Sequence, residues 1–109
     1  MSEREVLCVA NSYEQKYYLN ELFDGLPQGI KDELKIMCVL FTEDVGGIIT
    51  LVFDEEGNLE IEVEADEGDL LYDDIGSGLK VRKMQRDRGE LFESLEMFYK
   101  VFFMAGEEG

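Results

Sequence analysis

Five carboxylates between residues 66 and 74 have the clearest potential for chemistry in this sequence: Asp66, Glu67, Asp69, Asp73 and Asp74. Hard divalent cations prefer carboxylate oxygens, so this acidic cluster is a candidate metal site, although it lacks the calcium-loop pattern. Asp69 and Asp73 would lie on successive turns of one helix and could divide acid and base roles. A chain this acidic also produces such clusters by chance. We therefore expect no cofactor, and keep a metal-dependent or small-ligand-binding enzyme as the alternative function.

The sequence contains no histidine and only two cysteines, Cys8 and Cys38. Histidine is the commonest general base, so its absence excludes Ser-His and Cys-His dyads within this chain. A tetrahedral zinc site would need carboxylates or a second chain beside the two thiols. Both cysteines lie among apolar residues, and we expect them in the core in reduced form. These exclusions favour a non-catalytic protein.

Acidic residues outnumber basic residues by 26 to 10, which gives a formal net charge of −16. A field of this sign repels nucleic acids and anionic membranes. No apolar run is long enough to span a bilayer, and the opening MSEREVLCVA lacks the basic start of a secretory signal. We therefore expect a cytoplasmic protein whose partner is a second copy of the chain or another protein, with no nucleic acid and no membrane.

Half of the basic residues follow the acidic cluster as one run: Lys80, Arg82, Lys83, Arg86 and Arg88. On a helix, Lys83 would pair with Asp87 and Arg86 with Glu90, which predicts a salt-bridged solvent face or a basic strip that docks on an acidic surface. Arg88 falls within the apolar arc of that helix. We expect it at a domain edge, with a buried carboxylate or a ligand as alternatives.

The tripeptide Gly76-Ser77-Gly78 precedes the basic run. If residues on both sides of this tripeptide belonged to one helix, the apolar residues before it and those after it would lie on nearly opposite faces. The apolar face therefore changes at the tripeptide, which we call the phase slip. A bare GxG is a weak phosphate-binding pattern, and the neighbouring Asp73 and Asp74 would repel a phosphate. We predict a joint or a close packing contact at this point.

The segment IITLVFDEEGNLEIEVEA, residues 48–65, contains the clearest structural signal. Two runs of alternating apolar and polar residues flank a three-residue turn, and this turn places Asp54 opposite Asn58. This register directs six apolar side chains into the core: Ile49, Leu51, Phe53, Leu59, Ile61 and Val63. Glu60, Glu62 and Glu64 point the other way and face no lysine within the hairpin. We call them the glutamate ladder and predict that they contact a partner.

A helix is predicted over residues 27–45, with Pro27 in its first turn and Gly46-Gly47 at its end. One apolar stripe consists of Ile30, Leu34, Met37, Cys38, Phe41 and Val45. A second stripe, Ile36, Val39 and Leu40, lies on the opposite side. A helix that is apolar on two faces is buried on two faces, so we expect another element or a second subunit to cover these three partner-contact candidates.

Together these elements predict a single α+β domain over residues 1–109. Two β-hairpins form an antiparallel sheet, and two main helices near 27–45 and 80–104 pack on it, in the order ββαββα. The first hairpin depends on the aromatic segment KYYLNELF. If residues 13–23 are helical, the order becomes βααββα, or ααββα if the first strand is also absent.

Three segments, ANSYEQKYYLN, IMCVLFTEDVGGI and EADEGDLLYDDIGSGLK, resemble a family of small acidic proteins from anaerobic Gram-positive bacteria, a domain of unknown function. The resemblance covers nearly the whole chain. It implies a bacterial, cytoplasmic protein and brings no activity or site residues. The two-sided helix and the glutamate ladder favour a non-catalytic protein-interaction or regulatory module that acts as a homodimer.

Overall fold

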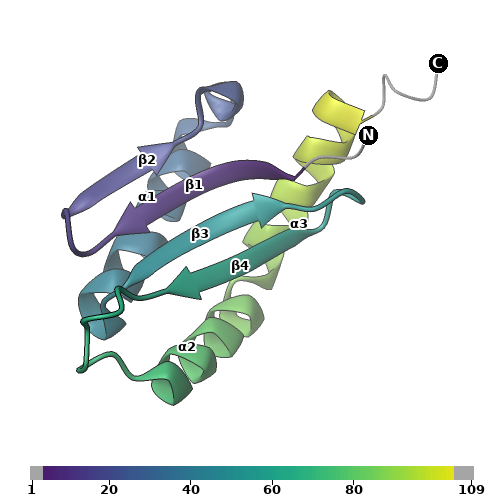
Figure 1. Ribbon diagram of the computed structural model, residues 1–109. Coiled ribbons are helices and arrows are strands. Elements are labelled where there is room, and N and C mark those ends of the chain that lie inside the picture. The colour runs from purple at the N-terminus through teal and green to yellow at the C-terminus, as the bar shows by residue number, and fades with distance from the viewer. Residues whose placement is uncertain (1–3, 105–109) are drawn as a thin grey trace.

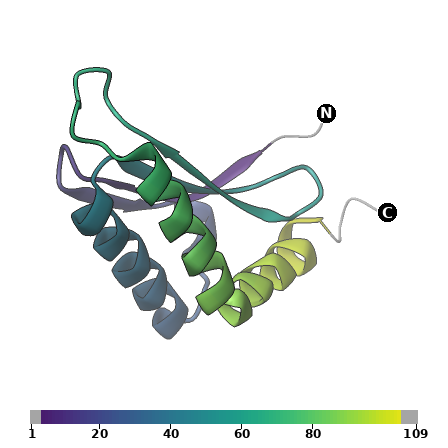
Figure 2. The same cartoon turned by 90° about the horizontal axis from the view of Figure 1, so that it is seen from below.

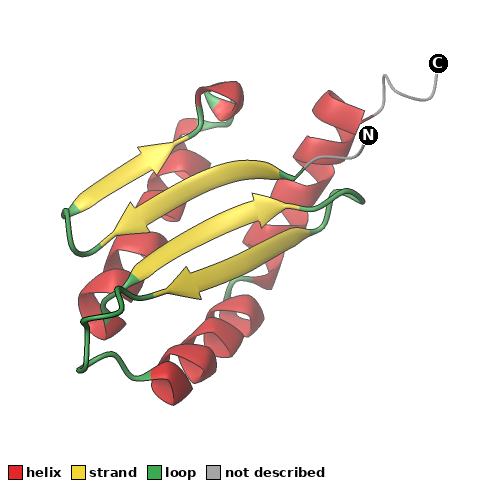
Figure 3. Cartoon of the chain, in the orientation of Figure 1, coloured by secondary structure: helices red, strands yellow, loops and turns green. Residues whose placement is uncertain are grey.

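The computed structural model describes residues 4–104 and contains one four-stranded antiparallel sheet (Figure 1). Its strands are β1 (Glu5–Asn11), β2 (Lys16–Leu19), β3 (Ile48–Phe53) and β4 (Leu59–Glu64), in the spatial order β2-β1-β3-β4. The helices are α1 (Gln28–Val45), α2 (Asp74–Asp87) and α3 (Gly89–Tyr99), with a 3₁₀ turn η1 (Glu21–Phe23) and a π-helical end η2 (Lys100–Met104). The predicted α+β class and the two hairpins are confirmed (Figure 3).

The helices α1, α2 and α3 lie on the same face of the sheet (Figure 2). No helix of the described chain covers the other face, which we call the open face. An antiparallel sheet tolerates this arrangement because alternate side chains can be apolar on one face and polar on the other. The core therefore fills the space between the sheet and the helix layer.

The first hairpin confirms that the aromatic segment returns as a strand, so the helical alternatives for residues 13–23 are wrong. The turn begins at Asn11, whose side-chain oxygen accepts hydrogen bonds from the backbone N–H groups of Tyr13 (2.9 Å) and Glu14 (3.2 Å). Gln15 closes it with a φ of 55°, in the left-handed region that non-glycine residues rarely adopt. Local side-chain chemistry at the turn thus determines the pairing of β1 with β2.

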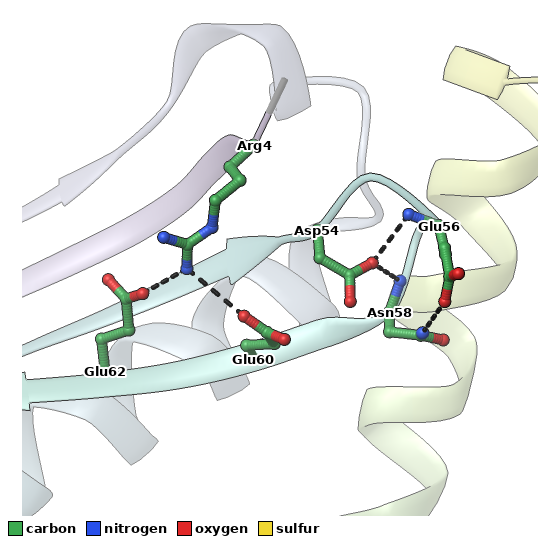
Figure 4. Close-up of polar contacts among 6 residues, drawn as sticks. All are labelled: Arg4, Asp54, Glu56, Asn58, Glu60 and Glu62. Atoms are coloured by element: carbon green, nitrogen blue, oxygen red, sulfur yellow. Dashed lines mark hydrogen bonds and ion pairs between the residues drawn. The ribbon is translucent and has the colours of Figure 1, made fainter. Parts of the chain in front are cut away.

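The second hairpin has the predicted register, with Phe53 opposite Leu59 and Asp54 bonded through its N–H to the carbonyl of Asn58 (2.8 Å). Gly57 supplies the left-handed residue of the turn, at φ 86°. The Asp54 carboxylate accepts hydrogen bonds from the backbone N–H groups of Asn58 and Glu56, each 2.9 Å long (Figure 4). These bonds favour the ionised form and lower the pKa of Asp54.

Aromatic rings fill one end of the core. Phe53 stacks on Tyr99 with ring centroids 4.2 Å apart, and Phe23 lies 5.5 Å from Phe53. Elsewhere in the core, the Sγ atoms of Cys8 and Cys38 lie 3.9 Å apart. Both thiols are fully buried, as predicted, and the contact with Cys8 together with burial raises the pKa of Cys38.

The predicted single helix over 80–104 is wrong, because the helix breaks at Arg88 (φ −114°, ψ 29°). α2 ends there and α3 begins at Gly89, a residue with poor helix propensity. The break leaves Arg88 half-buried at the edge of the helix layer, where its guanidinium donates to Glu33 of α1 (2.8 Å). The expected edge position of Arg88 is therefore confirmed.

The predicted joint at Gly76-Ser77-Gly78 is also wrong, whereas the close-packing alternative is confirmed. The three residues belong to the first turns of α2, and the phase slips because Ile75 and Leu79 point to solvent. Ser77 is buried, with its Oγ 2.6 Å from the Tyr72 hydroxyl.

Asp73 caps the N-terminus of α2, since its carboxylate accepts a hydrogen bond from the backbone N–H of Gly76 (3.0 Å). We expect Asp73→Ala to lower the free energy of unfolding by about 1 kcal/mol, because an orphan helical N–H loses its acceptor. Urea denaturation monitored by circular dichroism measures the change. Asp73→Asn keeps a capping oxygen and serves as the control. Equal losses in both variants would contradict a capping role.

Candidate functional site

The acidic cluster is spread over the loop before α2 and the first residues of that helix. The Asp69 carboxylate accepts a hydrogen bond from the Tyr13 hydroxyl (2.6 Å), which raises the pKa of Tyr13. The same hydroxyl accepts from the backbone N–H of Asp66 (3.1 Å). This loop is therefore tied to the turn of the first hairpin.

The predicted placement of Asp69 and Asp73 on successive turns of one helix is wrong, because α2 begins at Asp74. Asp66, Glu67 and Asp74 are exposed. Within residues 4–104, no group of three or more cysteine, aspartate or glutamate side chains is arranged to hold a metal ion. The geometry thus supplies no observation in favour of the metal-dependent alternative.

The glutamate ladder lies on the open face, opposite Ile48, Thr50 and Val52 of β3, as the register predicts. Its counter-charge comes from outside the hairpin (Figure 4). The Arg4 guanidinium lies 3.3 Å from Glu60 and forms a closer ion pair with Glu62, and the Glu62 contact raises the pKa of Arg4. All three side chains are about half exposed, so the pairs are screened by water.

A β-bulge brings Arg4 to the open face. Val6 is opposite Val52, and Cys8 is opposite Leu51, the residue directly before Val52 in β3. Two steps along β1 thus match one step along β3, so Leu7 is an extra residue in β1. Side chains alternate between faces along a strand, and one extra residue inverts that alternation. Arg4 therefore points away from the core that holds Cys8. Local sequence patterns do not indicate this pairing, because they reveal neither the bulge nor a contact between residues 56 positions apart.

The second apolar stripe of α1 is divided by the structure. Ile36 and Leu40 are each 55% exposed, on the side of α1 that faces away from the sheet, while Val39 is half-buried on a neighbouring face. α2 adds Ile75 and Leu79, which are 79% and 59% exposed. We call Ile36, Leu40, Ile75 and Leu79 the outer helix surface. Within the described chain, no element covers it.

Ion pairs join α1 and α2, which lie side by side (Figure 2). Lys80 pairs with Asp44 near one end of the contact, and Arg88 pairs with Glu33 near the other. The two helices are therefore antiparallel, and part of the basic run docks on α1 in the same chain. For Lys80 and Arg88, the structure agrees with the predicted alternative of a basic strip that docks on an acidic surface.

Of the two ion pairs predicted within α2, Lys83 with Asp87 is present and Arg86 with Glu90 is not. Lys83 pairs with Asp87 (2.6 Å) and lowers the pKa of that carboxyl group. Arg86 lies 3.5 Å from Asp87, while its predicted partner Glu90 follows the helix break. Arg82 has no ion pair within residues 4–104.

No helix within residues 4–104 combines the length and hydropathy that crossing a bilayer requires. The sheet with one open face, the helix layer and the surface charge define a small acidic α+β protein. The chain belongs to DUF6145, a family of unknown function whose model matches residues 4–108. This confirms the resemblance to a domain of unknown function. No curated protein and no solved structure gives a significant match.

Proposed function

We propose that this protein is a non-catalytic interaction module that acts as a homodimer through its outer helix surface. The exposure of Ile36 and Leu40 carries the proposal, because both belong to an apolar stripe that the rest of the described chain leaves uncovered. Ile75 and Leu79 on the neighbouring helix α2 are exposed as well, and a second copy can cover the exposed side chains of both helices. Burial of exposed apolar side chains is the main driving force for such association.

Charge complementarity favours a second copy as the partner. Helical spacing puts Asp32 and Glu43 beside Ile36 and Leu40 on α1, and all four are exposed. On α2, the same spacing puts Arg82 and Arg86 beside Leu79. In a two-fold arrangement, α1 of one copy would face α2 of the other. The acidic residues Asp32 and Glu43 that border the contact on one copy, its acidic margin, would then meet the basic residues Arg82 and Arg86 of the other, its basic margin, and symmetry repeats this match once. This local match offsets the repulsion between two chains that each carry a formal charge of −16.

The glutamate ladder lies on the opposite side of the sheet from this surface. Glu60, Glu62 and Glu64 are therefore outside the proposed dimer contact, and their role as contacts for a basic partner remains a separate prediction. The free, fully buried thiols of Cys8 and Cys38 are consistent with a reducing compartment such as the cytoplasm, which we also propose.

Sedimentation velocity of the full chain, together with native mass spectrometry, tests the proposal. We expect a dimer. Arg82→Glu with Arg86→Glu should weaken it at least about tenfold, because each new carboxylate would face an acidic margin. Adding Asp32→Lys and Glu43→Lys to that variant should restore the dimer by reversing both margins.

The matched control is Lys16→Glu with Lys100→Glu, which changes the net charge equally at positions away from the outer helix surface. We expect this variant to retain the wild-type dimer at the same ionic strength. A monomeric wild-type chain, or equal weakening by the control, would refute the proposed contact.

A further inference from the structure

A cavity of about 610 Å³ lies between the turn of the first hairpin and α1. Asn11, Ser12, Gln15 and Lys16 line it from the hairpin, and Lys35 and Glu43 line it from α1. Its volume falls in the range of small-molecule binding sites. Glu43 is the one residue that this cavity shares with the acidic residues of the proposed dimer contact.

The polar groups on its walls are mostly donors. Neither the Lys16 nor the Lys35 ammonium group has an ion pair or hydrogen bond within the described chain, although carboxylates greatly outnumber basic residues. Asn11 uses its side-chain oxygen for the turn, which leaves its amide N–H groups for a ligand. Glu43 supplies an acceptor. Two unpaired ammonium groups beside further donors match an anion rich in oxygen.

Tyr17 forms part of the same wall and has an unsatisfied hydroxyl. The oxygen is fully buried and has no hydrogen-bond partner within residues 4–104. The hydroxyl lies beside the sulfur of Cys8, a weak acceptor, and burial raises the pKa of Tyr17. A buried polar group without a partner is costly, so such groups call for an explanation.

Backbone strain lies at the same place. Gln15 holds its side chain at the cavity with a φ of 55°, where glycine or asparagine is the usual residue. Strained residues of this kind cluster at ligand sites, where the surrounding structure maintains them. The strained backbone of Gln15 therefore supports the interpretation that this cavity is a ligand site.

We propose that this cavity binds a small organic anion that carries a phosphate or carboxylate group. Lys16 and Lys35 hold the anionic group from opposite walls, one on β2 and one on α1. Glu43 accepts a hydrogen bond from a hydroxyl or amino group elsewhere on the ligand. The site binds its ligand without any covalent step.

Amide NMR titration of the isotope-labelled full chain tests the proposal with three probes: inorganic phosphate, glycerol phosphate and succinate. We expect at least one probe to shift the amide resonances of the hairpin turn and of the α1 turns around Lys35 and Glu43, with saturation. The responding probe distinguishes a phosphate from a carboxylate ligand. Physiological ionic strength should be used, because salt then screens the long-range repulsion of anions.

Lys16→Ala and Lys35→Ala should each weaken that binding about tenfold or more, since each removes a charge-assisted hydrogen bond. Lys100→Ala removes the same charge from a lysine that also lacks an ion pair but is outside the cavity, and should leave the affinity unchanged. Gln15→Gly should keep the turn while weakening binding, because glycine adopts a positive φ without strain. Unchanged spectra of the unliganded variants outside the substituted site would show that they fold.

Absence of saturable shifts for all three probes up to roughly 10 mM would overturn the proposal. Equal weakening by Lys100→Ala would also overturn it, because the effect would then come from net charge. The dimer measurement is separate from both outcomes, because the Lys16 and Lys35 substitutions leave Ile36, Leu40, Ile75 and Leu79 of the outer helix surface unchanged.

Discussion

The double substitution Ile36→Glu with Leu40→Glu is expected to convert the proposed dimer into a folded monomer. Both side chains are more than half exposed within one chain, so glutamates there remain hydrated and stability changes little. In the dimer the same positions would be buried, and burying an unpaired carboxylate is strongly unfavourable. We expect the dimer dissociation constant to rise at least about 100-fold.

Sedimentation velocity and circular dichroism on the same sample separate dissociation from unfolding. Leu22→Glu with Met97→Glu is the matched control, because these side chains are 56% and 65% exposed and lie outside the outer helix surface. This control should stay dimeric. If the Ile36/Leu40 variant unfolds, the stripe belongs to the core of the monomer. If it remains a dimer, the contact lies elsewhere.

The substitution Phe53→Ala is expected to lower the free energy of unfolding by about 3–5 kcal/mol. Phe53 is fully buried and joins the sheet to α3 through its stack on Tyr99 and to η1 through its contact with Phe23. Its removal leaves a cavity among rings that cannot all move inward, because they come from different elements. This expected loss is a large fraction of the stability of an ordinary small domain.

Urea denaturation measures this effect against Phe102→Ala, which removes the same side chain from a position that is 69% exposed. We expect the Phe102 variant to differ from wild type by about 0.5 kcal/mol or less. Similar losses in both variants would show that the ring cluster around Phe53 does not stabilise the fold as described.

The second hairpin was predictable to the residue because its information is local. Alternation determines which side chains face the core, and Gly57 defines the turn that pairs Phe53 with Leu59. α1 was equally predictable, since the residues at both its ends and its main apolar stripe lie within one segment. Short-range geometry was sufficient for both elements.

The C-terminal helices were not predictable in the same way. A helical wheel assumes one continuous axis, but the chain leaves helical geometry at Arg88, where a contact with Glu33 stabilises the break. The wheel also assigned Ile75 and Leu79 to a phase slip because it treats apolar residues as facing the core, although α2 is continuous there and both side chains face solvent. Long-range contacts determine where such helices end.

The candidate sites also differ in whether local patterns or long-range contacts define them. The exposed stripe Ile36 and Leu40 could be found by its periodicity, whereas Arg4 reaches the glutamate ladder through a bulge that no periodicity reveals. The cavity could not be predicted from the sequence either. Lys16 and Lys35 look like ordinary solvated lysines until the sheet brings the first hairpin against α1.

The glutamate ladder also has a consequence for the sheet edge that carries it. β4 is an outer strand, and its register leaves the backbone groups of Ile61 and Val63 facing away from β3, while Glu96 accepts a hydrogen bond from the N–H of Leu59 (2.8 Å). Such an edge is a template for strand addition. A second β4 docked there would bring two rows of glutamates together, and three carboxylates outweigh the single guanidinium of Arg4. The ladder therefore protects the protein against edge-to-edge aggregation and sheet polymerisation.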